Sequence, residues 1–292
     1  MIASCCLDKS DGKLRKRVKS HQPPGGLTTF SHPRCYLRDT CNCSEDISRE
    51  HYVSANVLAQ LGSSILISGV PWLALDETMD LAIDNLASKI LCKRHNEALS
   101  PLDAEAGSFF RSLTEALADL ERSSTSRKPN FHLASGTALE YWMLKVACGM
   151  YFSIAAKDKV RLSETHTIDL IKIRRAFFEG IWDDRGGLYF KGHIGSAMTT
   201  AWSVVVSPLS DDAAKIFSGV RIALLGLELE LLFDTTNVNQ GPWTGIIRRP
   251  TELIFEKGGR EHHIILTWPA GTPENGIHLS DEPPPGVARL PR

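Results

Sequence analysis

The chain has 292 residues, of which 42% are hydrophobic and 23% are charged, so it can bury one large core or two smaller ones. Its 33 basic and 34 acidic residues give a formal net charge of -1, which excludes a strong overall attraction to nucleic acid and leaves only local patches for that purpose. No apolar run approaches the length of a membrane span, and no apolar segment follows the basic residues near the start. We therefore expect an intracellular, cytoplasmic protein without a membrane partner.

The first 33 residues are polar and interrupted by Pro and Gly, and they include a short basic run. This composition predicts a flexible basic N-terminal tail over residues 1–33, or alternatively an arm that contacts phosphate groups. The basic run consists of Lys13, Arg15, Lys16, Arg17 and Lys19.

The next segment, residues 34–122, is predicted to form a first domain. Apolar residues at helical spacing predict a helix from about residue 53 to Gly62, and an extended run follows over residues 64–73, which Pro71 ends. A second helix is predicted from Asp80 to Ile90.

The most clearly predicted helix starts at Ser100, which can cap it, with Pro101 in the first turn and Asp103 bonding back to the cap. Its apolar stripe consists of Phe109, Phe110, Leu113, Leu117 and Leu120. The polar residues 123–130 then break the pattern and predict a domain boundary.

The second half, residues 131–271, is predicted to be an α+β domain with an antiparallel sheet. Residues 134–154 predict an amphipathic to buried helix, and residues 164–179 predict another helix. After Gly186 the chain is rich in β-branched and aromatic residues separated by Gly, Asp and Pro, which is typical of strands. Residues 272–292 are expected to be a loose, Pro-rich tail.

The chain has seven cysteines, an odd number, and most of them lie in its first third. In an intracellular protein such clustering indicates metal binding rather than disulfides. Zinc prefers four sulfur or nitrogen ligands in a tetrahedron, and Cys92 and His95 have the spacing of one ligand pair. Cys35 with either Cys43 or Cys41 would complete the site. A third possibility is the set Cys35, Cys41, Cys43 and Cys92, which leaves His95 free.

A Glu50-His51 pair lies seven residues after Cys43, and Asn96 follows His95 directly. Hydrolysis of a phosphodiester needs a base to activate water and a divalent ion to neutralise charge. A histidine can be that base near neutral pH, and a carboxylate and an amide oxygen suit Mg²⁺ or Mn²⁺.

Residues 35–103 resemble the HNH endonuclease superfamily, through Cys35, the Ser-x-Glu-His segment that ends at His51, and Leu91-Cys92-x2-His95-Asn96. The resemblance implies a small zinc-stapled ββα-metal module followed by a helix. It implies structural zinc on Cys35, Cys43 (or Cys41), Cys92 and His95. It also implies His51 as the general base and a catalytic divalent ion on Glu50 and Asn96. Asn85 is the nearest candidate for the middle polar residue of the family pattern.

The sequence thus favours a metal-dependent endonuclease that hydrolyses phosphodiester bonds of nucleic acid, with DNA as the expected partner and a homodimer as one possible assembly. Arg49, Lys93 and Arg94 flank the site and are expected to hold the DNA backbone. The alternative is a non-catalytic zinc module that binds nucleic acid or protein. A hydrolase site in the C-terminal half has no supporting signature such as GxSxG or a P-loop.

Overall fold

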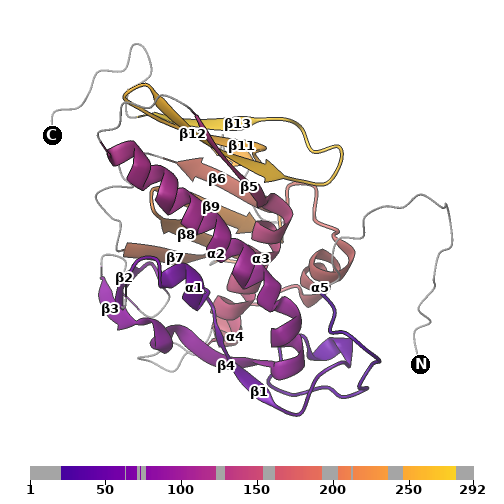
Figure 1. Cartoon of the computed structure of the whole chain (residues 1–292). Helices are drawn as coiled ribbons and strands as arrows, with labels where there is room; N and C mark the ends of the chain where they lie inside the picture. The colour runs from indigo at the N-terminus through magenta and orange to yellow at the C-terminus, as the bar shows by residue number, and fades with distance from the viewer. Residues whose placement is uncertain are drawn as a thin grey trace.

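The computed structural model describes residues 21–62, 64–70, 73, 77–122, 129–153, 162–192, 203–211, 213–235 and 246–280. The predicted basic run between residues 13 and 19, Pro71, and residues 123–128 of the predicted domain boundary lie outside this part. The described residues form a mixed α+β structure, as predicted (Figure 1). None of its helices combines the length and the apolar composition that crossing a membrane requires.

The helices and short 3-10 turns of the described residues are η1 (Arg38–Thr40), α1 (Ala55–Leu58), η2 (Ile83–Leu86), α2 (Lys93–Glu121), α3 (Gly136–Phe152), α4 (Leu162–Thr165) and α5 (Leu170–Glu179). The strands are β1 (Ile47–His51), β2 (Ser64–Ser68), β3 (Met79–Ala82), β4 (Ala87–Cys92), β5 (Asn130–Ser135), β6 (Gly187–Gly192), β7 (Ser203–Asp211), β8 (Ile216–Leu224), β9 (Leu227–Leu232), β10 (Ile247–Arg248), β11 (Glu252–Lys257), β12 (Arg260–Thr267) and β13 (Gly276–Ser280).

The described strands form three sheets. β1 pairs with β4, the second sheet has the order β10-β6-β9-β8-β7-β2-β3, and the third has the order β13-β11-β12-β5. The predicted antiparallel pairing holds for most neighbours, but β2–β7, β11–β13 and β12–β5 are parallel. Because β2 and β3 come from the first half of the chain and join β6–β10, one sheet spans both sides of the predicted boundary.

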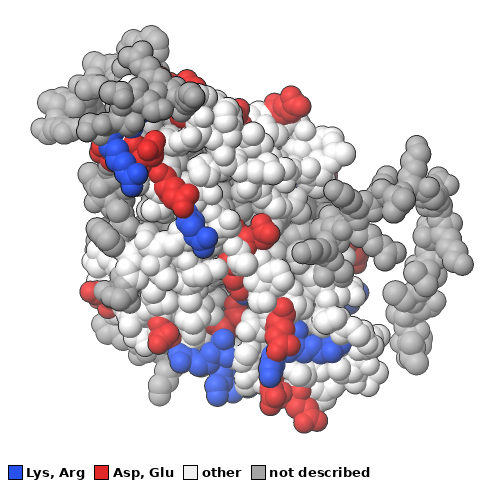
Figure 2. All heavy atoms as spheres, viewed as in Figure 1, with Lys and Arg blue, Asp and Glu red and all other residues white. Residues whose placement is uncertain are grey.

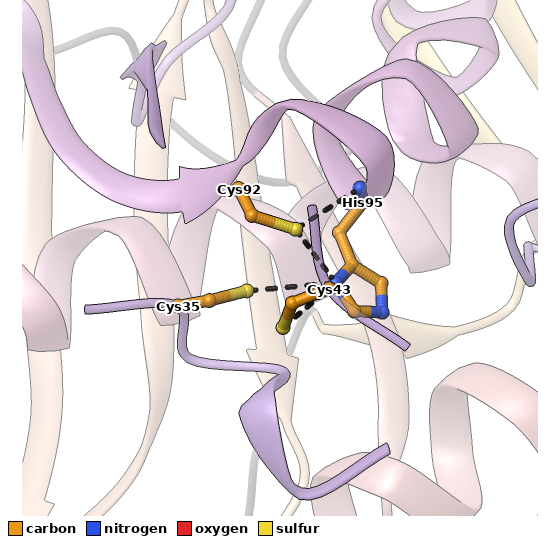
Figure 3. Close-up of side chains that lie close together, drawn as sticks. All are labelled: Cys35, Cys43, Cys92 and His95. Atoms are coloured by element: carbon orange, nitrogen blue, oxygen red, sulfur yellow. Dashed lines mark hydrogen bonds between the residues drawn. The ribbon is translucent and has the colours of Figure 1, made fainter. Parts of the chain in front are cut away.

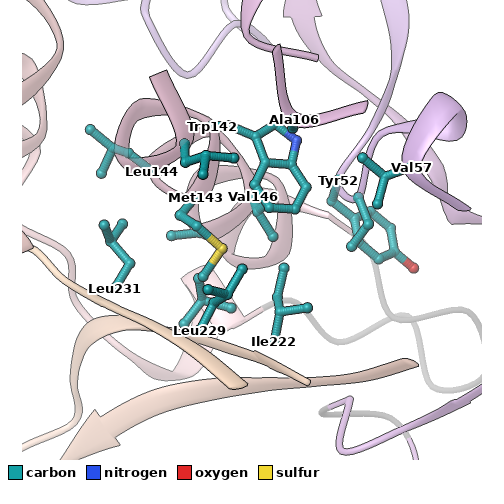
Figure 4. Packing of buried hydrophobic residues seen from close by; sticks show 14 of the residues in the cluster. Tyr52, Val57, Ala106, Trp142, Met143, Leu144, Val146, Ile222, Leu229 and Leu231 are labelled. Carbon is teal, nitrogen blue, oxygen red and sulfur yellow. The ribbon is translucent and has the colours of Figure 1, made fainter. Parts of the chain in front are cut away.

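Helix α3 is the central helix and packs against α2 and against β6–β9 of the seven-stranded sheet. Met143 points toward Leu229 of that sheet, whereas the ring of Trp142 lies beside Ala106 of α2 (Figure 4). The predicted helix over residues 134–154 is confirmed for residues 136–152, and its burial extends around the whole circumference. Residues 134 and 135 belong to β5 instead, and residue 154 lies outside the described part. A helix buried all round must find partners for any charge that it carries.

The predicted helix from Asp80 to Ile90 is wrong. This segment forms β3, η2 and β4, and β4 pairs antiparallel with β1. Leu86 and Ile90 are both buried and four residues apart, which resembles helical spacing. Backbone pairing with β1 overrides that local pattern, because the ladder supplies the hydrogen bonds that a helix would otherwise form.

The predicted start of the long helix at Ser100 is also wrong, since α2 begins at Lys93 and Cys92 is its N-cap. Pro101 lies inside the helix, where it cannot donate to the carbonyl of Glu97. The hydroxyl of Ser100 donates to that carbonyl at 3.0 Å instead, so the helix passes through the proline with this acceptor satisfied.

Two further expectations are corrected in part. Residues 164–179 form two helices, α4 and α5, because Asp169 caps the second by accepting from the backbone of Ile171 and Lys172. Residues 276–280, which were expected to belong to a loose tail, form β13 in parallel with β11.

Candidate metal centre and adjoining pocket

The β1–β4 ladder and the first turn of α2 position the predicted site residues. In the ladder, Ile47 faces Cys92, Glu50 faces Ser88 and His51 faces Ala87, with an irregularity between Ser48 and Glu50. Helix α2 starts directly after β4, so the ligands near Cys92 and the residues at the end of β1 are held on one rigid unit.

Cys35, Cys43, Cys92 and His95 form a buried cluster, each with 1% or less of its surface exposed. Their ligand atoms all lie within 4.8 Å of one another, and Figure 3 shows the three sulfurs directed at the ring of His95. His95 Nδ1 lies 3.1 Å from the sulfur of Cys92, 3.5 Å from that of Cys35 and 3.7 Å from that of Cys43. These side chains are positioned to bind a metal such as zinc.

The spacing of the cluster agrees with tetrahedral zinc. With Zn–S bonds of about 2.3 Å and Zn–N bonds of about 2.0–2.1 Å, a tetrahedron separates nitrogen from sulfur by about 3.5 Å. The three observed nitrogen–sulfur distances lie on both sides of this value. The hydrogen bond from the thiol of Cys35 lowers the pKa of Cys92, which favours the thiolate form that a metal ligand needs.

Thr40 fixes the orientation and protonation of His95. Its hydroxyl donates to the carbonyl of Leu37 at 2.8 Å, and its oxygen lies 3.0 Å from Nε2 of His95. Since the hydroxyl proton is already used, Nε2 must be the protonated nitrogen and donate to Thr40. With its proton on Nε2, His95 would bind a metal through Nδ1, the nitrogen that lies beside the three sulfurs.

Cys41, the alternative ligand, lies outside the cluster. It is exposed, ends η1 in a left-handed conformation (φ 52°), and its sulfur lies 3.5 Å from the hydroxyl of Ser31. The structure therefore selects Cys43 rather than Cys41, and it includes His95 in the set.

A pocket of about 260 Å³ adjoins the cluster and contains all three residues predicted to be catalytic, Glu50, His51 and Asn96. Consecutive residues of a helix are about 100° apart, so His95 can face the sulfurs while Asn96 faces the pocket. The complete lining consists of Arg49, Glu50, His51, Ser54, Ala55, Asn56, Asn96, Ser100 and Asp103.

Two charged residues of this site, Asp103 and Lys145, were not among the predicted site residues. Lys145 is 2% exposed, and its Nζ lies 2.6 Å from Glu50 Oε1 and 2.5 Å from Asp103 Oδ2. Asp103 also accepts a hydrogen bond from Ser54, whose oxygen in turn accepts from Trp142 Nε1 at 2.7 Å. A lysine inside an apolar helix and an aspartate two helical turns after Asn96 were the available signals.

The pKa values of the two central residues shift in opposite directions from their ordinary values. Burial raises the pKa of Glu50 to about 7, even though the charge of Lys145 opposes this. Burial lowers the pKa of His51, so its ring is neutral at pH 7. Nε2 of His51 is buried without a hydrogen-bond partner among the described residues, and Asp84 Oδ1 lies 4.0 Å away.

The other flanking residues behave differently from one another. Arg94 donates to the carbonyls of Pro24 and Gly26, both at 2.8 Å, so it anchors the N-terminal segment rather than facing outward. Arg49 is exposed on the pocket rim, and Lys93 is exposed. Asn85 lies in η2 and is not part of the pocket lining.

Comparison of the chain with models of protein families, with curated proteins and with solved structures finds no match. Interpretation of the site therefore rests on its own residues and geometry. Those establish a buried Cys3His cluster, suited to a metal such as zinc, beside a pocket lined by Glu50, His51 and Asn96.

Proposed function

We propose that the chain is a metal-dependent endonuclease of the HNH type that hydrolyses phosphodiester bonds in DNA. The observation that carries this proposal is the convergence of Glu50, His51 and Asn96 on one pocket beside the Cys3His cluster. The antiparallel pair of β1 and β4, followed by α2, also supports it, since the resemblance to the HNH superfamily implies two antiparallel strands followed by a helix. Here α1, β2, β3 and η2 lie between the two strands in the sequence.

His51 is suited to be the general base. Its ring is neutral at pH 7, and Nε2 has no competing hydrogen bond among the described residues. In the proposed reaction the ring of His51 takes a proton from a water molecule, the water oxygen bonds to phosphorus, and the bond from phosphorus to the leaving sugar oxygen breaks. The leaving oxygen then takes up a proton from solvent.

Glu50 and Asn96 would hold the divalent ion through a carboxylate and an amide oxygen, which match the preference of Mg²⁺ or Mn²⁺. When bound, that ion supplies positive charge beside the scissile phosphate. Asp103 adds a further carboxylate to the pocket wall. The zinc cluster fixes the first turn of α2 and thereby the position of Asn96.

Incubation of supercoiled plasmid with the protein and MgCl2 or MnCl2 tests this function. We expect nicking by the wild type, and a loss of at least 100-fold in His51→Ala and in Asn96→Ala. His278→Ala is the matched control, because His278 is an exposed histidine on β13. Equal nicking by wild type and His51→Ala would remove the endonuclease assignment. A single-stranded RNA substrate in parallel tests the preference for DNA.

A second candidate function is a non-catalytic zinc module that binds nucleic acid or protein. The ion pair of Glu50 with Lys145 favours it, because an internal cation already neutralises the carboxylate that a divalent ion would use. This alternative predicts bound zinc, no nicking with either ion, and unchanged nucleic-acid affinity in His51→Ala.

A further inference from the structure

A second cavity, of about 300 Å³, lies beside β4 and is distinct in its chemistry from the pocket around His51. The residues that line it include the basic Arg34, Arg38 and Lys89 and two serines, Ser88 and Ser163. We call it the Arg34–Lys89 groove. Its full lining is Pro33, Arg34, Cys35, Tyr36, Arg38, Ser88, Lys89, Ile90, Phe152, Ser163 and Leu170.

Among the described residues that line the groove there is no Asp or Glu, and the basic residues Arg34, Arg38 and Lys89 are all exposed. The buried Cys35 of the metal cluster also belongs to the lining. Within the described residues, Arg34 and Lys89 form no ion pair. Arg38 lies 3.8 Å from Asp39, but both side chains are more than half exposed, so solvent screens that contact. Basic and hydroxyl-bearing residues along one hollow suit the oxygens of a phosphate group.

The groove also has an aromatic wall. Tyr36 and Phe152 are stacked, with ring centroids 5.7 Å apart and an interplanar angle of 9°. Phosphate groups alone do not need an apolar surface, whereas a nucleotide presents a sugar and a base beside its phosphate. Cations that meet an aromatic wall are typical of surfaces that bind nucleic acid strands.

The position of the groove relates it to the proposed active site. Ser88 of the groove is the strand partner of Glu50, and the neighbouring Ala87 is the partner of His51. Paired strands are about 4.8 Å apart, so the groove and the pocket lie on adjacent strands of one ribbon. Figure 2 shows basic side chains, interspersed with acidic ones, over the lower end of the molecule, where Figure 1 places β1 and β4.

We propose that the Arg34–Lys89 groove binds the phosphodiester backbone of a nucleic acid strand beside the phosphate presented to His51. This inference rests on the proposed function and adds to it the surface that holds the substrate. Arg34 and Lys89 pair with phosphate oxygens, and Phe152 contacts the adjoining sugar or base.

The test measures binding of a fluorescein-labelled 20-base-pair DNA duplex by anisotropy, without divalent ions, over 50–200 mM NaCl. The test protein is the His51→Ala chain carrying Arg34→Gln and Lys89→Gln. Both groove residues are exposed, so the substitutions leave the core intact, and a thermal melt checks this. Because two phosphate contacts are lost, the slope of log affinity against log salt concentration should fall by about 2, with at least tenfold weaker binding at 100 mM NaCl.

The matched control is His51→Ala carrying Arg122→Gln and Lys215→Gln, which removes one arginine and one lysine from exposed positions outside the groove. It should bind like the His51→Ala parent. Equal affinity and slope in the groove variant and this control would overturn the proposal that the groove binds DNA. Nicking by the wild type would then still support the proposed endonuclease activity. Conversely, if the groove variant binds DNA more weakly but the wild type does not nick plasmid, the groove remains a binding site and the proposed endonuclease activity is overturned.

A competition experiment tests whether the groove binds a nucleic acid strand or a free nucleotide. Thymidine 5′-monophosphate should displace the duplex only at a concentration at least 100 times that of an unlabelled duplex competitor. If the mononucleotide competes as well as the duplex, the groove is a nucleotide site and the proposal of a backbone site is overturned.

Discussion

Replacement of Cys43 and of Cys41 by serine separates the metal centre from its sequence neighbour. The two cysteines are only two residues apart, yet Cys43 is 1% exposed and 3.7 Å from His95 Nδ1, whereas Cys41 is exposed on η1. Cys43→Ser therefore removes one of four ligands, and Cys41→Ser removes none. A serine at position 43 also leaves three donors that do not close a tetrahedron.

The size of the effect follows from linkage. If the free zinc concentration is about 1,000 times the dissociation constant, zinc stabilises the folded protein by about 4 kcal/mol. For a chain of this size about 1 kcal/mol changes the melting temperature by roughly 2–4 °C. Loss of the metal in Cys43→Ser should therefore lower the melting temperature by about 10 °C, while Cys41→Ser should stay within about 2 °C of the wild type.

Two measurements check this prediction: zinc content by elemental analysis after dialysis against a weak chelator, and thermal unfolding by circular dichroism. Wild type and Cys41→Ser should each retain one zinc per chain, and Cys43→Ser should retain less than about a tenth of that. Equal loss of zinc from both variants, or one full zinc in Cys43→Ser, would refute the assignment of Cys43.

Three other predictions concern the neighbours of the metal centre and the buried ion network. Thr40→Val removes the acceptor for His95 Nε2 and should weaken zinc binding by about 10–100-fold in a chelator competition; unchanged affinity would contradict the proposed role of Thr40. Lys145→Met leaves Glu50 and Asp103 without their shared cation and should cost about 3–5 kcal/mol in urea unfolding, and a loss under about 1 kcal/mol would contradict it. The pKa of Glu50 is raised to about 7 from an ordinary 4.5. Between pH 4.5 and pH 7, Glu50 is therefore protonated in the folded state and has lost its proton in the unfolded state. Its contribution of roughly 3 kcal/mol is therefore present below pH 4.5 and lost as the pH rises through 7. Glu50→Gln should remove this part of the pH dependence of the unfolding free energy. A pH profile that runs parallel to that of the wild type would contradict this role of Glu50.

The metal ligands Cys35, Cys92 and His95 and the pocket residues Glu50, His51 and Asn96 were accessible from sequence, because they depend on residue type and short spacing. Cys92 and His95 lie within one turn, Glu50 and His51 are adjacent, and Asn96 follows His95. The burial of the central helix was equally clear from its apolar composition. These are local properties of the chain, and local patterns survive folding.

Three features depended on contacts between distant residues and were not accessible. The segment before Cys92 forms β3, η2 and β4 rather than a helix, because β1 offers it a pairing partner. Helix α2 starts at Lys93 rather than Ser100, because Cys92 is held as the N-cap within the metal cluster. The shared sheet of β2 and β7 brings together strands from the two halves of the chain.

By itself, the sequence determined which side chains could bind a metal and which could act on a phosphodiester, since those abilities belong to the residues. Only the tertiary structure decided between Cys41 and Cys43, because the choice depends on which thiol the turn at η1 directs inward. It alone brought Lys145 of α3 to Glu50 and Asp103, since a buried carboxylate must find a cation and the nearest in space is 95 positions later in the sequence than Glu50.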